Sequence, residues 1–593
     1  MAGAFSSVVS ALRHHASVRP DARAYTFLIE RSGEEQASLT FAELDRYAGV
    51  VAAHLRRRGR PGDRALLLFP PGLDFLISLF GCFYAGMIAV PMMPPRKHRL
   101  RESTLNIAAD CTPTFGMTVE GLLEANQTSL AQAQNLPDIE WVATDTLINP
   151  AAADRDMRAP DYEPESATIA FLQYTSGSTS MPKGVMVSHG NLAANLEMIR
   201  VALEYDHRST HVNWVPLYHD MGLVLNALET CYVGAHCVLM APNAFMQRPL
   251  SWLTAISRYR AQVAGGPNFG FDLCVERHRP EALEGVDLSC WRVAINGAEP
   301  VRSETLARFT RTFTAYGLSG EPIVQPSYGM AEATLLISGG LRPAPVLWEV
   351  SRRLLQSNKA VAPQPGESAQ YLVGCGKALL GERIAIVDPG SLHRLPVGEV
   401  GEIWVQGPNV AQGYWGNNDA TLQTFRARIA GEDEGCWLRT GDLGCLDSTG
   451  ELYVTGRIKD VLIIRGENHY PQDIEGTAER SHRSLRPHCS AAFVARRGDA
   501  DLLVVVLEVD RAGRRSVDIA EISAAVRQAV VQEHDVTVND VVLIRTGTIP
   551  KTTSGKIRRS LTRELWSKNE LELWAPTGPA ESNKIRTPAP EPS

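Results

Sequence analysis

The sequence predicts an α/β protein in which largely parallel sheets are layered with helices. From about residue 40 onward, short β-rich runs alternate with helical stretches, and Gly and Pro residues separate them. The clearest predicted strands are Arg64–Phe69, His236–Met240, Val293–Asn296 and Glu402–Gln406. Strands that alternate with helices are typical of layered α/β folds. Because 593 residues are too many for one hydrophobic core, we expect two or more domains.

Changes of pattern indicate where these domains begin and end. A strand ends in Gly456–Asp460, and a new α/β pattern then runs to about Trp574. Between Pro343 and Gln370 the regular pattern is lost, which predicts an inserted surface segment around one short helix. The last residues are Pro-rich, as in disordered tails. The expected organisation is a large domain (1–458, with an insertion at about 343–370), a small domain (459–574) and a disordered tail (575–593).

Charge and cysteine spacing argue against two kinds of function, nucleic-acid binding and a cysteine-based zinc site. The formal net charge is -7 and no long basic block occurs, so we expect no nucleic-acid partner. The ten cysteines form no C-x-x-C pair, and the closest two, Cys231 and Cys237, have no histidine at zinc-like spacing. We therefore expect the cysteines to be buried, reduced thiols of a cytoplasmic protein. The N-terminus lacks the basic and apolar regions of a signal peptide.

One uncharged segment, Phe75–Met93, resembles a membrane span in composition. It contains Gly86 and runs into Pro91. A buried helix that ends near Gly86, followed by a strand at Met87–Val90, explains the segment equally well. Stable membrane insertion is therefore not expected, although the span remains an alternative.

The strongest local signal is the segment Tyr174–Gly184, YTSGSTSMPKG. It follows the apolar run Ile169–Leu172 and precedes a helical stretch that starts near His189. Hydroxyls and backbone amides around a glycine can wrap phosphate oxygens, and Lys183 can neutralise them. A Walker loop ends in Gly-Lys-Ser/Thr, so the Pro-Lys-Gly order excludes it. A flexible linker is the remaining alternative. The candidate phosphate-binding residues are Thr175, Ser176, Gly177, Ser178, Thr179 and Lys183.

This loop resembles the phosphate-binding motif of the adenylate-forming superfamily, which includes acyl-CoA synthetases, luciferases and nonribosomal adenylation domains. Further motifs match in the expected order over residues 20–570. They are Pro216–Gly222 (PLYHDMG), Asn296–Pro300 (NGAEP), Ser327–Glu332 (SYGMAE), Arg439–Gly444 (RTGDLG), Gly456–Asp460 (GRIKD) and Pro550–Lys556 (PKTTSGK). The resemblance implies a large N-terminal domain of layered α/β subdomains with a small β-barrel-like subdomain, and a small, mobile α+β C-terminal domain.

The resemblance also implies roles for single residues. Adenine would lie between Gly297–Glu299 and the ring of Tyr328, and a tyrosine ring suits a flat heterocycle. Asp442 would accept hydrogen bonds from the ribose hydroxyls, and Arg457 would hold the ribose or phosphate side. The nucleotide-binding set, beyond the phosphate loop, is Gly297, Ala298, Glu299, Ser327, Tyr328, Gly329, Met330, Ala331, Asp442 and Arg457.

Three residues carry the implied chemistry. Glu332 resembles the carboxylate that binds Mg²⁺, the expected cofactor beside ATP. Lys556 would bridge the attacking carboxylate and the α-phosphate. His219 would lie near the same atoms, with a core histidine bonded to a backbone carbonyl as the alternative.

Other basic residues receive different roles. By alignment Lys459 is the hinge about which the small domain would swing. Lys551, Arg558 and Arg559 are expected to be solvated or to face a carrier protein.

Within the superfamily the chain looks most like the fatty acyl-AMP ligases. This resemblance rests on the insertion and on the amino-acid sequences of three segments: Leu172–Ser178, Trp214–Leu223 and Gly265–Leu273. The branch implies a fatty acid substrate and an insertion that packs on the large domain and limits the swing that admits coenzyme A. The expected acyl pocket comprises Trp214, Met221, Gly222, Phe269, Phe271 and Thr334, although apolar stripes are more often plain core.

The acyl acceptor should be a separate protein. No Gly-x-Asp-Ser phosphopantetheine site follows residue 460, so a separate acyl carrier protein or polyketide synthase carrier domain is the expected partner. Arg483, Arg486, Arg496 and Arg497 could meet such an acidic protein, or could simply be solvated. An acyl-CoA synthetase of the same fold and a catalytically inactive homologue remain alternatives.

Overall fold

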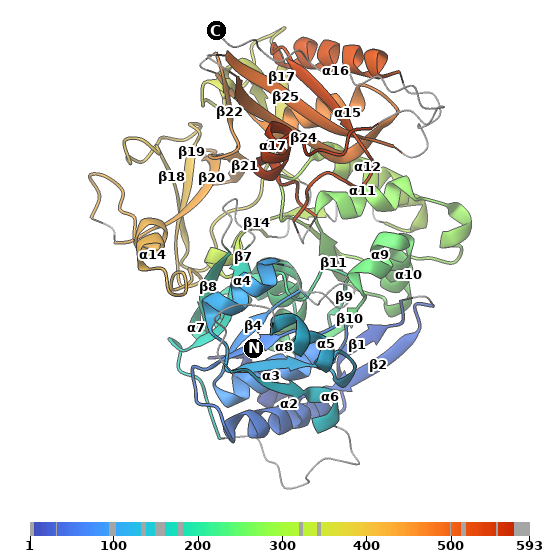
Figure 1. Ribbon diagram of the computed structural model, residues 1–593, viewed down its shortest axis with the longest axis vertical. Helices are drawn as coiled ribbons and strands as arrows, with labels where there is room; N and C mark the ends of the chain where they lie inside the picture. The colour runs from blue at the N-terminus through green and yellow to red at the C-terminus, as the bar shows by residue number, and fades with distance from the viewer. Residues whose placement is uncertain are drawn as a thin grey trace. The chain divides into compact units, whose positions relative to one another are not determined.

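The structure is a computed structural model that divides into two compact units, Met1–Lys459 and Asp460–Ser593, here named the large and the small unit (Figure 1). The described residues are 5–30, 32–93, 102–131, 138–148, 161–175, 182–318, 324–340, 345–433, 435–465, 467–497, 500–510, 518–552 and 555–574. The expected tail, 575–593, lies outside them.

Two mainly parallel sheets form the centre of the large unit. In the seven-stranded sheet only β2 runs antiparallel to its neighbour, and in the six-stranded sheet only β8 does. The first has the order β13 (Val324–Pro326), β12 (Val293–Asn296), β11 (Val263–Gly266), β9 (Thr210–Asn213), β10 (His236–Leu239), β1 (Arg23–Leu28) and β2 (Glu35–Thr40). The second has the order β6 (Glu140–Ala143), β5 (Phe115–Thr118), β3 (Arg64–Leu67), β4 (Ile88–Pro91), β7 (Ile169–Thr175) and β8 (Lys183–Ser188). The predicted layered α/β class is thereby confirmed.

Helices fill the space around these sheets. They are α1 (Val8–Val18), α2 (Phe41–Arg56), α3 (Asp74–Ala85), α4 (Glu102–Cys111), α5 (Glu120–Leu130), α6 (Thr144–Leu147), α7 (His189–Leu203), α8 (Glu229–Val233), α9 (Pro242–Gln247), α10 (Leu250–Tyr259), α11 (Asn268–Glu276) and α12 (Ser303–Phe313). Three 3₁₀ turns are η2 (Pro280–Leu283), η3 (Thr314–Tyr316) and η4 (Ala331–Ala333). The uncharged segment resolves into α3, buried on every side from Phe75 on, a left-handed Gly86 cap at φ 70°, and β4. No helix in the described part of the chain has both the length and the hydropathy needed to span a lipid bilayer.

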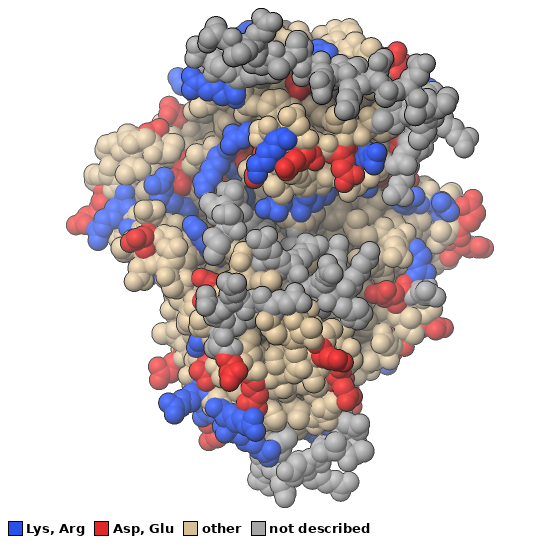
Figure 2. Space-filling model, in the orientation of Figure 1, with Lys and Arg blue, Asp and Glu red and all other residues tan. Residues whose placement is uncertain are grey.

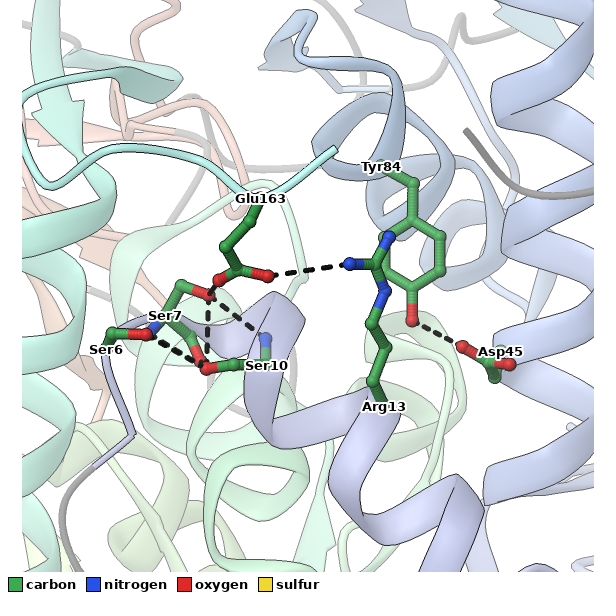
Figure 3. A network of polar contacts seen from close by, with 7 residues as sticks. All are labelled: Ser6, Ser7, Ser10, Arg13, Asp45, Tyr84 and Glu163. Atoms are coloured by element: carbon green, nitrogen blue, oxygen red, sulfur yellow. Dashed lines mark hydrogen bonds and ion pairs between the residues drawn. The ribbon is translucent and has the colours of Figure 1, made fainter. Parts of the chain in front are cut away.

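Polar contacts at the N-terminus join helices that are distant in sequence (Figure 3). The Ser7 hydroxyl, at the cap of α1, donates to Glu163 over 2.8 Å. Arg13 of α1 also reaches Glu163, over 3.5 Å, and lies 4.9 Å from the ring centroid of Tyr84 on α3. The Tyr84 hydroxyl donates to Asp45 of α2 over 2.6 Å. These contacts fix α1 against α2 and α3.

A four-stranded antiparallel sheet forms the β-rich part of the large unit. It comprises β18 (Arg383–Val387), β19 (Gly401–Gln406), β20 (Leu438–Leu446) and β21 (Leu452–Arg457), with α14 (Asn418–Phe425) beside β20. Its hairpin β20–β21 pairs Asp442 with Arg457, so two motifs of the sequence become neighbours.

The insertion is more regular than expected. Besides the one helix, α13 (Arg352–Gln356), it contains strand β16 (Leu347–Ser351), and the antiparallel partner of β16, β17 (Ala369–Val373), begins at its end. These strands were not predicted, because residues on both of their faces are partly exposed and their sequences lack an alternating apolar pattern. The segment packs on the four-stranded sheet, since Trp348 lies 5.1 Å from the Tyr453 ring and the Ala360 N–H donates to the Gly398 carbonyl over 2.8 Å.

The small unit has its own α+β core. The sheet β24 (Leu485–Arg497), β25 (Ala500–Val509) and β26 (Asp540–Ile544) carries α15 (Pro471–Arg480), α16 (Ile519–His534) and α17 (Arg559–Ser567). A short hairpin, β22 (Leu462–Ile464) and β23 (Glu467–His469), follows the boundary between the units. Buried Ile474, Val505 and Val526 belong to one cluster, so the helices share a core with the sheet. On the face shown in Figure 2, acidic and basic side chains are interspersed.

Candidate active site

Three residues of the expected nucleotide site meet on the large unit. The hydroxyl of Tyr328, on β14 (Tyr328–Gly329), donates to Oδ2 of Asp442 over 2.8 Å. Nε of Arg457 lies 3.0 Å from Oδ1 of the same carboxylate. Tyr328 is buried, and burial together with the Asp442 charge holds the pKa of its hydroxyl well above the usual value. The tyrosine is therefore a hydrogen-bond donor, and the three motifs form one cluster.

Asp442 retains acceptor capacity in this cluster. An ionised carboxylate has about four lone-pair positions, and Tyr328 and Arg457 each use one. The Asp442 N–H donates to Oγ1 of Thr440 over 3.1 Å, which fixes the backbone on β20. Positions for ribose hydroxyls remain, so the geometry is compatible with the predicted role.

A second group of contacts joins Glu332 to the phosphate side. Glu332, on the 3₁₀ turn η4, is 8% exposed and accepts a hydrogen bond from the Tyr414 hydroxyl over 2.9 Å. Nζ of Lys183 lies 4.7 Å from the centroid of the same tyrosine ring. One aromatic residue thus contacts both the expected metal ligand and the expected phosphate-binding lysine.

The chemistry of this group fits Mg²⁺. Burial raises the pKa of Glu332, and the Tyr414 hydroxyl opposes that shift. A buried carboxylate is stabilised in its ionised form by a neighbouring cation. Mg²⁺ commonly takes one or two carboxylates and completes its shell with phosphate oxygens and water. No group of three or more His, Cys, Asp or Glu suited to a metal occurs in the described part of the chain. One buried carboxylate beside nucleotide phosphates fits Mg²⁺, and Glu332 is the residue that would hold it.

His219 has a carboxylate partner. Its Nδ1 lies 2.5 Å from Oδ1 of Asp220, and both side chains are mostly buried. Asp220 also accepts from the Met221 N–H over 2.7 Å and caps the π-helix η1 (Met221–Leu228). The alternative for His219 was a core histidine whose partner is a backbone carbonyl, whereas the observed partner is the Asp220 carboxylate. π-Helices are rare and frequent at functional sites.

Glycine is required where this π-helix starts. A Cβ on Gly222 would lie 2.1 Å from the Pro216 carbonyl oxygen. The His219 N–H donates to that same carbonyl over 3.1 Å, which closes a tight turn before the π-helix. The turn fixes the half-buried His219 just before the fully buried π-helix.

The expected adenine platform follows β12. Ala298 has a φ of 70°, an unusual value for a residue with a Cβ. The Ser327 N–H donates to the Asn296 carbonyl over 2.9 Å, so the NGAEP and SYGMAE segments lie side by side. A Cβ on Gly297 would lie 3.0 Å from the Ser327 carbonyl oxygen. Glu299 accepts from the Phe269 N–H over 3.3 Å, which links the platform to α11.

The segment Gly329–Ala331 forms the turn that presents Glu332. A Cβ on Gly329 would lie 1.9 Å from the Leu335 carbonyl oxygen. The Met330 N–H donates to that carbonyl over 2.8 Å. The backbone therefore turns sharply, which places Glu332 beside Tyr414.

Five of the six expected acyl-pocket residues lie in an aromatic cluster, at the start of the π-helix or beside Asn409. Trp214 stacks on Phe245 with centroids 3.8 Å apart and meets Phe269 at 5.6 Å. Met221 and Gly222 begin the π-helix, and the Thr334 hydroxyl donates to the Asn409 carbonyl over 2.7 Å.

Phe271 is placed differently. It is fully buried against Trp252 and Phe309, at 5.6 and 5.0 Å, as a core residue would be. The acyl pocket remains a prediction for all six residues.

Most of the phosphate loop lies outside the described residues. Ser176, Gly177, Ser178 and Thr179 belong to this part. Thr175 ends β7 and Lys183 begins β8, and the two pair in the antiparallel register. The ends of the loop are thus held together at the edge of the six-stranded sheet.

The catalytic lysine candidate lies in the small unit. The Thr552 N–H donates to the Lys556 carbonyl over 2.7 Å, and the Lys556 N–H donates to Oγ1 of Thr552 over 3.0 Å. Lys556 therefore lies on a tight hairpin. Lys459 is the last residue of the large unit, directly at the boundary.

One expectation for the basic residues near Lys556 is wrong. Arg559 is not solvated, because its side chain is 21% exposed and forms a two-pronged contact with Glu475 at 2.7 Å. Lys551 is exposed but donates to the His488 carbonyl over 2.9 Å. Two carboxylates in the fold attract Arg559, and sequence spacing does not reveal them.

Two further site residues were missed by the sequence reading. Tyr414 lies 82 positions from Glu332, in a loop without a recognised motif. Gln173 was noted only as part of a motif, and its Nε2 donates to the Tyr218 carbonyl over 3.0 Å, next to His219. A glutamine at the buried end of a strand was the available signal, because a buried amide needs partners.

Comparisons with known proteins agree with this geometry. The family description "AMP-binding enzyme" matches residues 12–415, and "Disco-interacting protein 2-like, AMP domain" matches residues 459–575. The chain is 42% identical over 580 residues to the medium-chain-fatty-acid–acyl-carrier-protein ligase JamA of Moorena producens, covering 96% of each chain. A crystal structure of a fatty acyl-adenylate ligase from Legionella pneumophila, in complex with acyl adenylate and pyrophosphate, is 37% identical.

Structural similarity extends over both units. The Legionella structure covers 96% of this chain and 97% of its own, with a TM-score of 0.73. A structure from a study of fatty acyl-adenylate ligases of E. coli and L. pneumophila is 32% identical, covers 95% and 98%, and has a TM-score of 0.85. The resemblance drawn from the motifs is confirmed: the chain belongs to the AMP-binding enzyme family.

Proposed function

We propose that this enzyme activates a fatty acid with ATP to an acyl-adenylate and then transfers the acyl group to the phosphopantetheine thiol of a separate acyl carrier protein. The observation that carries the proposal is the paired cluster on the large unit. It has two parts. Asp442 bonds to Tyr328 and Arg457 in the first part, and Tyr414 contacts Glu332 and Lys183 in the second. The names of the relatives supply the substrate class.

In the first half-reaction a carboxylate oxygen of the fatty acid attacks the α-phosphorus of ATP. The bond from that phosphorus to the bridging oxygen breaks, and pyrophosphate leaves. Asp442 and Tyr328 would hold the nucleoside, and Lys183 would bind phosphate oxygens as a point charge. A bound Mg²⁺, held by Glu332, would neutralise charge on the phosphates.

Lys556 would act on the charge that develops during this step. Attack places negative charge on the α-phosphate oxygens, and an ammonium group beside them stabilises the transition state more than the bound substrate. His219, fixed by Asp220, would adjoin the same reacting groups. In these assignments residues of the large unit bind ATP, and the rate of acyl-adenylate formation depends on Lys556.

In the second half-reaction the carrier thiol attacks the acyl carbonyl, and AMP leaves with the electrons of the carbon–oxygen bond. The thiol proton passes to solvent or to a basic group. We propose that the small unit reorients about Lys459 between the two steps, as the ends of an element can absorb such a change. Arg483 and Arg496 would be available to an acidic carrier, whereas Arg486 is paired with Glu508 at 2.7 Å.

The insertion supports a carrier protein as the acceptor. Its contacts with Tyr453 and Gly398 attach it to the four-stranded sheet. We propose that an insertion held in this way limits the orientations of the small unit and so disfavours coenzyme A. A cytoplasmic location remains a prediction from the cysteine pattern; the free cysteines are mostly buried.

Acyl-adenylate formation by the intact chain tests the proposed activity. Purified protein is mixed with ATP, Mg²⁺ and a series of fatty acids, and acyl-AMP and pyrophosphate are measured. Amino acids serve as the comparison substrates, since a buried ammonium requires a carboxylate partner. The proposal expects release of pyrophosphate with fatty acids and not with amino acids. Nucleotide binding without acyl-AMP from any acid would indicate an inactive homologue instead.

A further inference from the structure

Arg559 makes the most extensive ionic contact near Lys556. Its Nε and Nη2 lie 2.7 Å from the two carboxylate oxygens of Glu475, and its Nη1 lies 3.1 Å from Oδ2 of Asp460. We name Arg559, Glu475 and Asp460 the arginine clamp. The clamp is enclosed, because the exposed fractions of these side chains are 21%, 4% and 30%.

The clamp is anchored to the framework of the small unit. Glu475, on α15, also accepts a hydrogen bond from the Ala492 N–H on β24 over 2.9 Å. One guanidinium therefore faces two carboxylates, one of them almost fully buried. Burial opposes the charge on Arg559, but the two carboxylates outweigh it and raise its pKa. Removing the arginine would leave a buried carboxylate without its cation, which is strongly destabilising.

The hairpin with Lys556 ends at this clamp. The Arg558 N–H donates to the Pro550 carbonyl over 2.9 Å and closes the hairpin, and Arg559 is the next residue and the first of α17. At the opposite end the Ile549 N–H donates to buried Glu508 over 2.9 Å. The hairpin is thus attached at both ends, and Lys556 lies between them.

The clamp also reaches the boundary between the units. Asp460 directly follows Lys459 and is the first residue of the small unit. Arg559 thereby connects the start of this unit to the hairpin 99 positions further along the chain. This connection adds to the other contacts of the hairpin, so that a rotation about Lys459 would move the start of the small unit and the hairpin together.

We propose that Arg559 is a positioning residue for Lys556: through Glu475 and Asp460 it holds the lysine hairpin and the beginning of the small unit as one rigid body. The proposal rests on the proposed function, in which Lys556 acts during adenylation. Arg559 itself does not touch the reacting atoms.

Steady-state kinetics of three variants test this role. In Arg559→Ala we expect kcat for pyrophosphate release to fall about 10- to 100-fold, while KM for ATP changes less than about 3-fold, because the nucleotide contacts lie on the large unit. Arg559→Lys keeps the charge but loses the planar fork, so kcat should fall about 3- to 10-fold. The matched control is Arg558→Ala, whose exposed side chain neighbours the clamp, and its kcat should stay within about 2-fold.

Hydrogen exchange separates positioning from general loss of stability. In Arg559→Lys, peptides that cover 549–558 and 460–465 should exchange faster, while those of β25 should match the parent protein. If Arg559→Ala does not fold, Arg559→Lys and Asp460→Asn carry the test. A folded Arg559→Lys with unchanged kcat and unchanged exchange at the hairpin would overturn the proposal.

Lys556→Ala, measured in parallel, separates this inference from the proposed function. If Lys556→Ala is inactive and the Arg559 variants are fully active, only the clamp is overturned. If Lys556→Ala retains normal pyrophosphate release, the assigned role of the lysine fails, and the positioning role fails with it.

Discussion

The nucleotide side of the large unit and the lysine hairpin of the small unit are built differently. On the large unit Asp442, Tyr328, Glu332 and Tyr414 are all buried and bonded to one another in pairs. On the small unit Lys556 is half-buried in a short hairpin, where its carbonyl accepts from the Thr552 N–H and its own N–H donates to Oγ1 of Thr552. Binding groups are therefore fixed by the packing of the fold, whereas the catalytic group depends on the position of one hairpin. Variants in the two regions should fail in different ways.

Lys556→Ala should give the largest effect. We expect kcat for acyl-adenylate formation to fall about 100- to 1,000-fold, because the lost ammonium acted on charge that develops in the transition state. ATP affinity should change little, since the interaction is made mainly in that state. Pyrophosphate release and calorimetric ATP binding measure the two quantities. A variant with near-normal release would falsify the assignment.

Asp442→Ala should instead reduce nucleotide binding. Loss of hydrogen bonds to a charged acceptor costs about 1.5–3 kcal/mol, or about 10- to 150-fold in Kd for ATP. Asp447→Ala is the matched control on the same β-hairpin, because Asp447 caps the turn with its bonds to Thr449 and Glu451. Calorimetry with ATP distinguishes them. Equal ATP affinity in both variants would remove Asp442 from the site.

Tyr414→Phe should alter the need for Mg²⁺. The variant keeps the ring beside Lys183 but loses the hydroxyl that lowers the pKa of Glu332. The carboxyl should then hold its proton to higher pH and bind cations less well at low pH. A lost hydrogen bond of about 1 kcal/mol predicts an approximately 5-fold higher Mg²⁺ requirement.

The measurement for this variant is a Mg²⁺ titration of pyrophosphate release at pH 6.5 and pH 8, where the difference should be larger at pH 6.5. Tyr453→Phe is the control, since its hydroxyl also donates to a carboxylate, that of Asp447 in the turn between β20 and β21. An identical Mg²⁺ dependence in both variants would contradict the link between Tyr414 and the metal.

Glu382→Gln should give the smallest effect, on stability alone. Burial raises the pKa of Glu382 to about 8, against an ordinary value of 4.5. Between these values the unfolded chain has released the proton and the folded chain retains it, so the contribution of this group to stability falls as pH rises. The amide variant lacks that loss and can keep the hydrogen bond from Asn409.

Thermal unfolding at pH 5.5 and pH 8.5 measures this difference. Relative to the parent protein, the Tm of Glu382→Gln should rise by at least about 2 °C between the two values. A constant difference would show that Glu382 titrates normally in the folded state.

Much of the fold could be predicted from the sequence because its signals are local. The strand at Val293–Asn296 was predicted with its observed bounds, and α3 ends at Gly86 as the left-handed cap requires. The strands of the insertion, β16 and β17, could not be predicted, because each leaves part of both faces exposed and lacks a period-two apolar pattern.

The site was predictable only where a motif carries its own chemistry. Asp442 and Arg457 lie in separate motifs, and antiparallel pairing of β20 with β21 makes them neighbours. The contact of Tyr414 with Glu332 and those of Arg559 with Glu475 and Asp460 join segments 82, 84 and 99 positions apart, which no local pattern encodes. Such partners follow from packing, and residue type alone does not specify them.

The identity of the acylated product tests the central claim most directly. The intact protein is incubated with ATP, Mg²⁺ and dodecanoate, with equal concentrations of coenzyme A and a holo acyl carrier protein present together. Mass spectrometry then quantifies acyl-CoA and acyl-carrier protein. Acyl-carrier protein with little or no acyl-CoA is the expected product. Acyl-CoA as the main product would contradict transfer to a carrier protein and identify an acyl-CoA synthetase.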